Sequence, residues 1–164
     1  MTLIEYALVA AALLCGLVAG FVFCFAVVVI PGIRTLDDRE FLRSFKVMDK
    51  IIQDTSPLFV LVSLGTALVL LGTTLLAFSH LEGSALLLVV AACAIFLVGV
   101  QFPTFIINIP LNNRVQSLDL DSLSEGELHQ ERRTFEPRWT RWNSIRTVLA
   151  TVVTALLLLV LAGF

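Results

Sequence analysis

The feature that most constrains this 164-residue chain is a series of long apolar runs separated by shorter polar stretches. The first run, residues 3–30, is almost unbroken and long enough to cross a bilayer as a tilted helix. Three more runs cover residues 58–78, 85–108 and 144–162. Hydrophobic residues make up 58% of the chain and charged residues only 15%, unlike a soluble protein. The sequence therefore predicts an all-α, four-transmembrane-helix bundle, with residues 1–164 forming a single membrane domain.

A stripe of small residues runs along the first span, where Ala12, Gly16, Gly20 and Cys24 recur at intervals of four. Small side chains at this spacing let another helix approach closely. The approaching helix can belong to the same chain or to a second copy. Packing within the chain is the favoured interpretation, and a homo-oligomer through the Gly16/Gly20 stripe is the alternative.

A segment with helical amphipathic spacing follows the first span. Pro31 and Gly32 are expected to stop the first helix, and Asp37 with Glu40 has the pattern of a capping box that opens a new one. Apolar and basic side chains fall on opposite faces: Phe41, Phe45, Met48 and Ile52 on one, Arg39, Arg43, Lys46 and Lys50 on the other. We expect an amphipathic interfacial helix between spans 1 and 2, with Phe45 and Met48 turned inward as a lid over a pocket.

The third span contains Pro103, which cannot donate a hydrogen bond to the carbonyl of Gly99. We therefore expect a kink there, with Gln101 or Thr104 satisfying the freed carbonyl. In the long polar stretch that follows, Ser124 and Glu127 predict a short capped helix.

The basic residues predict the orientation in the membrane. All eleven lysines and arginines lie in the loops of residues 31–57 and 109–143 or, for Arg146, at the boundary of the fourth span. By the positive-inside rule these loops face the cytoplasm and both termini lie outside. The expected location is the cell membrane, with several crossings and membrane lipid as the surrounding partner.

Several function classes lack the residues that they need. The two histidines, His80 and His129, are expected on opposite sides of the membrane, and no carboxylate lies deep in a span. The ligand sets of zinc, di-iron and haem sites are therefore missing, and we expect no metal and no cofactor. A proton-coupled exporter would want an intramembrane carboxylate, and a quinone-linked disulfide enzyme a reactive cysteine pair near the surface. No nucleic-acid partner is expected.

What remains is a group of amides, one arginine and several aromatic residues at the cytoplasmic ends of spans 1, 3 and 4. The group comprises Asn108, Asn112, Asn143 and Arg146, next to Phe45, Met48, Trp139 and Trp142. Amides at this depth need hydrogen-bond partners, because an unpaired polar group in lipid costs several kcal/mol. Tryptophan and arginine also anchor span ends and asparagine caps helices, so each residue alone can have a purely structural role. The gathering of several amides favours a binding site.

Four motifs in this order resemble those of the anthrone oxygenase-like membrane proteins, a family largely of unknown function. They are Pro31-Gly32-Ile33, Phe45-x-x-Met48-x-x-Ile51, Asn108-x-Pro110-Leu111-Asn112 and Trp139-x-x-Trp142-Asn143-x-x-Arg146. The first loop departs from the family pattern, with Lys46-Val47-Met48-Asp49 and Ser56-Pro57 where members often have Gln-Met-Asn and Asn-Pro.

The resemblance implies a possible oxygenase that oxidises a polycyclic anthrone-type substrate with O₂ at the cytoplasmic membrane face. A cofactor-independent route suits such a substrate, because its carbanion can pass an electron to oxygen directly. In the resulting hypothesis Asn112 and Asn143 donate to the substrate oxygen and Arg146 stabilises its charge. The planar aromatic molecule is held by Phe45, Met48, Asn108, Trp139 and Trp142, and Asp49 is the nearest candidate base.

Two other interpretations stay open. A non-enzymatic small membrane protein would use the same pocket to bind a lipid or a partner protein. An oligomeric channel or carrier is the third, although no line of charged residues marks a pore.

Overall fold

In the computed structural model, residues 2–55 and 57–163 are described, without the side chains of residues 54–60. This part of the chain contains helices and short connections and no strand. Four helical stretches are long and apolar enough to cross a membrane: Leu3–Ile33, Leu61–His80, Gly83–Ser117 and Glu125–Ala162. The expected all-α, four-span bundle of a multi-pass membrane protein is confirmed.

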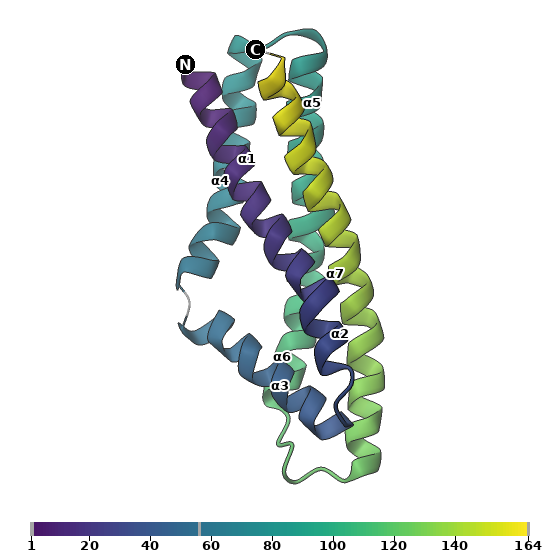
Figure 1. Cartoon of the computed structure of the whole chain (residues 1–164). Helices are drawn as coiled ribbons and strands as arrows, with labels where there is room; N and C mark the ends of the chain where they lie inside the picture. The colour runs from purple at the N-terminus through teal and green to yellow at the C-terminus, as the bar shows by residue number, and fades with distance from the viewer. Residues whose placement is uncertain (1, 56, 164) are drawn as a thin grey trace.

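The described residues form seven α-helices and four π-helical segments. The first span joins α1 (Leu3–Cys24), η1 (Phe25–Val29) and α2 (Ile30–Ile33). The interfacial helix α3 (Asp38–Lys50) continues into η2 (Ile51–Thr55), and α4 (Pro57–His80) is the second span. The third joins α5 (Gly83–Ile95), η3 (Phe96–Gln101), η4 (Thr104–Asn108) and α6 (Ile109–Ser117), and the fourth is α7 (Glu125–Ala162). Both termini lie at the end of the bundle opposite α3 (Figure 1).

The π-helical segments stand in a fixed relation to the prolines. The segments η1, η2, η3 and η4 end two residues before Pro31, Pro57, Pro103 and Pro110, respectively. A proline ring clashes with the carbonyl four residues earlier, and a wider turn moves that carbonyl away. In η1, η3 and η4 the widened pairing is direct, because the N–H of the residue before the proline donates to a carbonyl five residues back. The helices therefore continue past Pro31, Pro103 and Pro110.

This geometry changes two expectations. The first helix does not stop at Pro31 but continues to Ile33. At the third span, Thr104 Oγ1 donates to the carbonyl of Val100 at 2.7 Å, and Gln101 Nε2 reaches across to the carbonyl of Ser63 at 2.8 Å. Neither bond is made to the carbonyl of Gly99: the Thr104 bond has the ordinary four-residue spacing of a threonine in a helix, and the Gln101 bond joins the third span to the second.

Two apolar cores lie one above the other along the bundle. The bundle core, among α1, α4, α5 and α7, includes Leu8, Cys15, Leu70, Val89, Phe96, Ala150 and Leu157. The cap core, among α2, α3, α6 and the first half of α7, includes Ile30, Phe41, Phe45, Leu128, Phe135 and Trp139. In both cores apolar side chains from neighbouring helices pack closely together. This packing is the main stabilisation available within the chain.

The small-residue stripe is used partly inside the chain. Ala12 is buried, and a Cβ added at Gly16 would lie 3.8 Å from Thr154 Cγ2 of α7. Gly20 and Cys24 are exposed. Packing of α1 on α7 thus uses the first half of the stripe, and a homo-oligomer through Gly16 and Gly20 stays a prediction.

The polar stretch before the fourth span is more helical than we expected. Ser124 and Glu127 do form a capping box, but the helix that they open runs without interruption from Glu125 to Ala162 and includes Pro137. Its first half buries Leu128, Phe135 and Trp139 against the cap core, which explains why the helix persists outside the apolar run. Only residues 118–124 connect α6 to α7.

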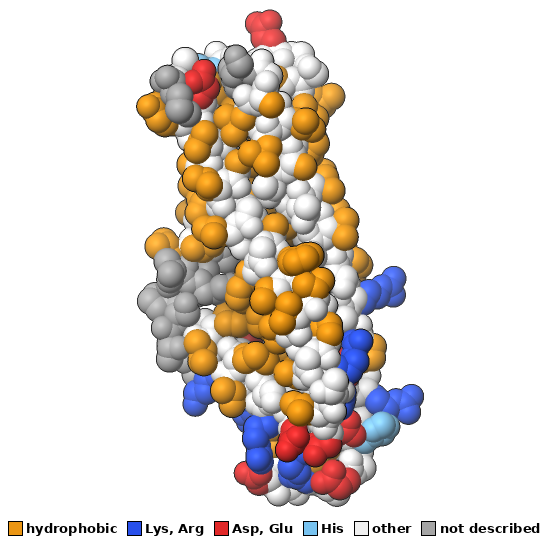
Figure 2. Space-filling view, in the orientation of Figure 1, with side chains coloured by type: hydrophobic (Ala, Val, Ile, Leu, Met, Phe, Trp, Pro, Cys, Tyr) orange, Lys and Arg blue, Asp and Glu red, His pale blue; other side chains and the backbone are white. Residues whose placement is uncertain are grey.

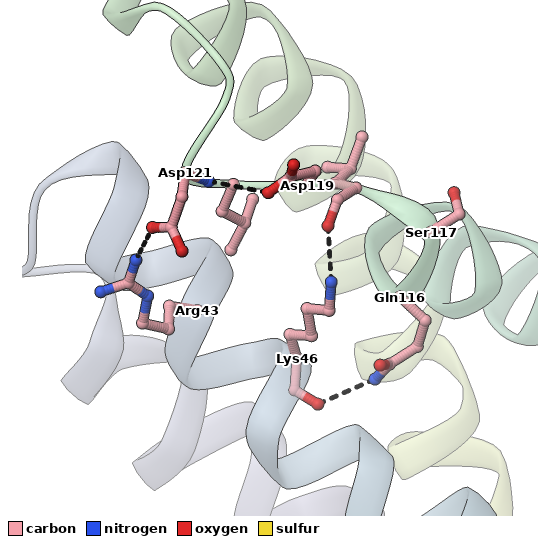
Figure 3. Close-up of a pocket in the computed structure, with 8 residues that line it drawn as sticks. Arg43, Lys46, Gln116, Ser117, Asp119 and Asp121 are labelled. Atoms are coloured by element: carbon pink, nitrogen blue, oxygen red, sulfur yellow. Dashed lines mark hydrogen bonds and ion pairs between the residues drawn. The ribbon is translucent and has the colours of Figure 1, made fainter.

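Charged side chains fasten α3 to this connection and to α7. Asp37 caps α3 by accepting from the Glu40 N–H at 2.8 Å. Arg43 pairs with Asp121, and Lys46 donates to the carbonyl of Leu118 (Figure 3). The basic face of α3 therefore caps loop carbonyls and carboxylates. Most charged residues gather at this end, and the sides of the bundle are largely apolar (Figure 2). That the end faces the cytoplasm stays a prediction.

Arg132 of α7 makes the most extensive of these contacts. Its guanidinium donates to Asp38 and Glu136 and to the carbonyls of Arg34 and Leu36, at 2.8–3.1 Å. It also lies 4.3 Å above the ring of Phe41.

Replacing Arg132 should loosen the interfacial helix. We expect Arg132→Ala to cost about 2 kcal/mol, because hydrogen bonds from a charged, partly buried group are lost. Thermal unfolding in detergent and hydrogen exchange of the α3 amides would measure the effect. Arg133→Ala is the matched control, since Arg133 is exposed; equal effects of the two variants would contradict the assignment.

Candidate functional site

A cavity of about 660 Å³ lies where the two cores meet. This volume is within the range of about 300–1,000 Å³ that is usual for small-molecule sites. Its wall is mostly apolar, and each of the four π-helical segments contributes a side chain, such as Phe25, Ile52, Val100 and Asn108. The turns widened before the prolines therefore shape this cavity, in keeping with the frequent occurrence of π-bulges at functional sites.

Arg146 and Asn143 of α7 form one polar wall. Arg146 is 7% exposed, and its Nη2 donates to Asn143 Oδ1 at 3.0 Å while its Nη1 donates to Thr104 Oγ1 at 2.8 Å. Asn143 Nδ2 donates in turn to the carbonyl of Val22 in α1 at 2.9 Å. This chain of bonds fixes the guanidinium among three spans. Within the described part of the chain, no carboxylate lies at salt-bridge distance from Arg146.

Three buried polar atoms at the cavity have no hydrogen-bond partner in the described structure. They are Asn108 Nδ2, Asn108 Oδ1 and Arg146 Nε. A polar group buried without a partner costs about 1–3 kcal/mol, so protein interiors rarely retain such atoms. Together they offer two donors and one acceptor. A ligand with an anionic or carbonyl oxygen and a neighbouring hydroxyl would match them.

Asp49, at the end of α3, forms the second polar wall. It is 2% exposed and accepts hydrogen bonds from three side-chain amides: Asn112 at 2.7 Å, Gln116 at 2.8 Å and Gln53 at 2.7 Å. Trp139 Nε1 donates to Asn112 Oδ1 at 2.7 Å, which fixes the orientation of that amide. Because an ionised carboxylate can only accept, the three donors suit the charged form of Asp49.

Aromatic rings line the side of the cavity nearest the cap core. The Trp139 ring lies 5.7 Å from Phe25 and 5.3 Å from Phe45, the latter edge to face. These centroid distances are typical of stabilising aromatic pairs. The rings give the cavity rigid flat surfaces suited to a planar ligand.

The structure brings most of the predicted site residues together. Phe45, Asn108, Asn112, Trp139, Asn143 and Arg146 all line the cavity. Met48 and Trp142 are half-buried and do not line it. On α3 and its continuation η2 the residues that reach the cavity are Phe45, Asp49, Ile52 and Gln53, so the inward face is turned by one position from Met48. Trp142 packs on the cap core.

Several contributing residues were not assigned to the site from the sequence. Gln53 and Gln116 hold Asp49, and Thr104 holds Arg146. A signal for the glutamines exists in the spacing. Gln53 lies four residues after Asp49, and Asn108, Asn112 and Gln116 recur at intervals of four, which places each set on one helix face.

No group of three or more His, Cys, Asp or Glu that would hold a metal ion occurs in residues 2–55 and 57–163. The polar side-chain groups that line the cavity include amides, hydroxyls, one guanidinium and one carboxylate.

The fold and the cavity together define a small multi-pass membrane protein with an internal, ligand-sized site of mixed charge. A sequence model of the anthrone oxygenase family matches residues 45–156, from Phe45 in α3 to the second half of α7. The chain belongs to the anthrone oxygenase family. No curated protein and no solved structure shows significant similarity to it.

Two asparagines in similar surroundings should respond oppositely to replacement by leucine. Asn108→Leu removes an amide without partners, so we expect the free energy of unfolding to rise by about 1–3 kcal/mol. Asn143→Leu strips partners from Arg146 and Val22 and should lower it by a similar amount. Thermal unfolding of both variants in the same detergent would measure this; destabilisation by Asn108→Leu would mean that its amide has partners.

Proposed function

We propose that this protein binds a planar polycyclic phenol in the cavity and oxidises it with O₂, in the manner of an anthrone to an anthraquinone. The observation that carries the proposal is the pairing of an uncompensated buried arginine and an unpartnered amide with a carboxylate in one apolar cavity. Membership of the anthrone oxygenase family supports the same chemistry.

The proposed reaction needs little from the protein. An anthrone CH₂ group is acidic because the negative charge of its carbanion is delocalised through the aromatic rings onto the carbonyl oxygen. After loss of the first proton, the carbanion reduces O₂ by one electron, and the resulting radical and superoxide combine into a C–O bond. Protonation gives a hydroperoxide, which loses water to form the second carbonyl. The sum is one CH₂ group plus O₂ giving C=O plus H₂O, with the substrate supplying all electrons.

Arg146 and Asn108 are proposed to hold the oxygen on which the negative charge develops. Preorganised donors in a site without water stabilise such charge more strongly than water does. Among the guanidinium nitrogens of Arg146, Nε has no hydrogen-bond partner in the described structure, and neither amide atom of Asn108 has one. The partners of Asn143 lie within the protein, so we assign Asn143 to positioning Arg146 rather than to contact with the substrate oxygen.

Asp49 is proposed as the base that removes the first proton. It lines the cavity on the wall formed by α3, and its charged form is held by Asn112, Gln53 and Gln116. Asn112 is thereby assigned to positioning the base. Phe45 and Trp139 flank the ring of the substrate, with Met48 and Trp142 supporting them from outside the cavity.

Removal of the charge on Arg146 should abolish most turnover. We expect Arg146→Gln to lower the rate of oxygen uptake with a simple anthrone by about 10²–10³-fold, the usual cost of losing one oxyanion donor. Arg141→Gln, at an exposed position five residues earlier, is the control. If the purified wild-type protein takes up oxygen no faster than buffer, the cavity serves a non-enzymatic binding role instead.

The role of Asp49 can be separated from that of Arg146 by pH. Asp49→Asn should slow oxygen uptake by about 10²–10⁴-fold at neutral pH, because general base catalysis is lost. At a pH where the anthrone ionises unaided, the Asp49→Asn variant should recover relative to wild type, whereas Arg146→Gln should not. Asp121→Asn, at an exposed position, controls for the charge change. Equal recovery of both site variants would contradict Asp49 as the base.

A further inference from the structure

The cavity wall contains a patch that faces outward from the bundle. Three of its lining residues are both apolar and about half exposed: Leu17 of α1 at 60%, Leu64 of α4 at 46% and Phe105 of η4 at 50%. We call these three residues the rim. All three belong to transmembrane stretches.

The rim residue Leu17 lies at the depth of the hydrocarbon. The first span is 31 residues long, or about 46 Å at 1.5 Å per residue, against a hydrocarbon thickness of about 30 Å. Leu17 stands about 21 Å from the start of that span. However the span is shifted along the membrane normal, this position stays within the hydrocarbon.

The other end of the cavity is closed by packed side chains. Phe45, which is 1% exposed, lies 4.5 Å from Phe135 and 5.3 Å from Trp139 between ring centroids. Below these rings, Phe41 is fully buried and the charged contacts of α3 hold the cap core in place. A flat molecule that came through the cap core would have to part this aromatic packing.

From these observations we infer that the ligand reaches the cavity sideways from the bilayer, through the rim, and is therefore a membrane-dissolved molecule. This inference rests on the proposed function for the identity of the ring system and deepens it. The ligand enters with its apolar body against Leu17, Leu64 and Phe105, and its hydrogen-bonding edge reaches Asn108 and Arg146. Conjugates with a permanent charge are excluded, because they do not dissolve in hydrocarbon.

The test measures the rate at which a probe binds rather than its affinity, since equilibrium is independent of the route. Protein in phosphatidylcholine vesicles is mixed with a dihydroxyanthraquinone, and the change in probe fluorescence gives the binding rate. Leu17→Trp, which enlarges a rim side chain, should slow binding several-fold. Leu13→Trp is the matched control: Leu13 lies one turn away on α1, is 65% exposed and does not line the cavity.

A second pair keeps the test decisive if one variant folds poorly. Leu64→Trp should slow binding, whereas Leu68→Trp, one turn along α4 and 70% exposed, should not. An anthraquinone disulfonate, which has the same rings but stays in water, should bind far more slowly than the neutral probe. Wild-type binding rates in both rim variants, or binding of the disulfonate as fast as the neutral probe, would overturn the inference.

The same experiments distinguish this inference from the proposed function. Slow probe binding in the rim variants, without any anthrone oxidation by wild type, would support access from the bilayer and reject the oxygenase. Oxidation that depends on Arg146, with unchanged rates of probe binding in the rim variants, would support the oxygenase and reject access from the bilayer.

Discussion

The constraint on which this structure depends is the need of every backbone polar group in hydrocarbon for a partner within the protein. Pro103 lies inside the third span, Pro110 lies nearer the end of the same span, and Pro31 lies near the end of the first. Each of these prolines removes a backbone donor. The chain meets this constraint by widening the preceding turn into a π-helical segment instead of ending the helix. A widened turn rotates the following side chains, and the cavity forms where those rotated faces meet.

The π-helical segments also help to hold one buried positive charge, that of Arg146. Arg146 is held by Thr104, which lies in a π-helical segment, and by Asn143, which is bonded to the carbonyl of Val22 just before another. A guanidinium placed in an apolar wall without a carboxylate beside it is costly unless a ligand supplies compensating charge. The proposed oxyanion of an anthrone-type substrate would do so, and Asp49 on the opposite wall would keep the site close to neutral before the ligand arrives.

Apolar periodicity and capping patterns predicted the spans, the start of α3 at Asp37 and the start of α7 at Ser124, since these features depend on neighbouring residues alone. The polar cluster was also predictable, because amides at the end of an apolar run must find hydrogen-bond partners close by. The position of Met48 was not: the apolar pattern of α3 favours it as an inward residue, but the hydrogen bonds of Asp49 to Asn112 and Gln116, 63 and 67 residues away, turn the helix. The π-helical segments likewise arise from geometry that a 3.6-residue period does not contain.

The unpartnered atoms of Asn108 and Arg146 tie the stability of the fold to mass action. A protein that carries unsatisfied polar groups in its unliganded state recovers their cost when a matching molecule binds, and that recovered free energy adds to the affinity. By linkage, a ligand present at 100 times its dissociation constant stabilises the fold by about 2.7 kcal/mol. The melting temperature of the protein therefore reports binding. Measured with each of a panel of membrane-soluble phenols, the increase in melting temperature would rank these ligands without any assay of turnover.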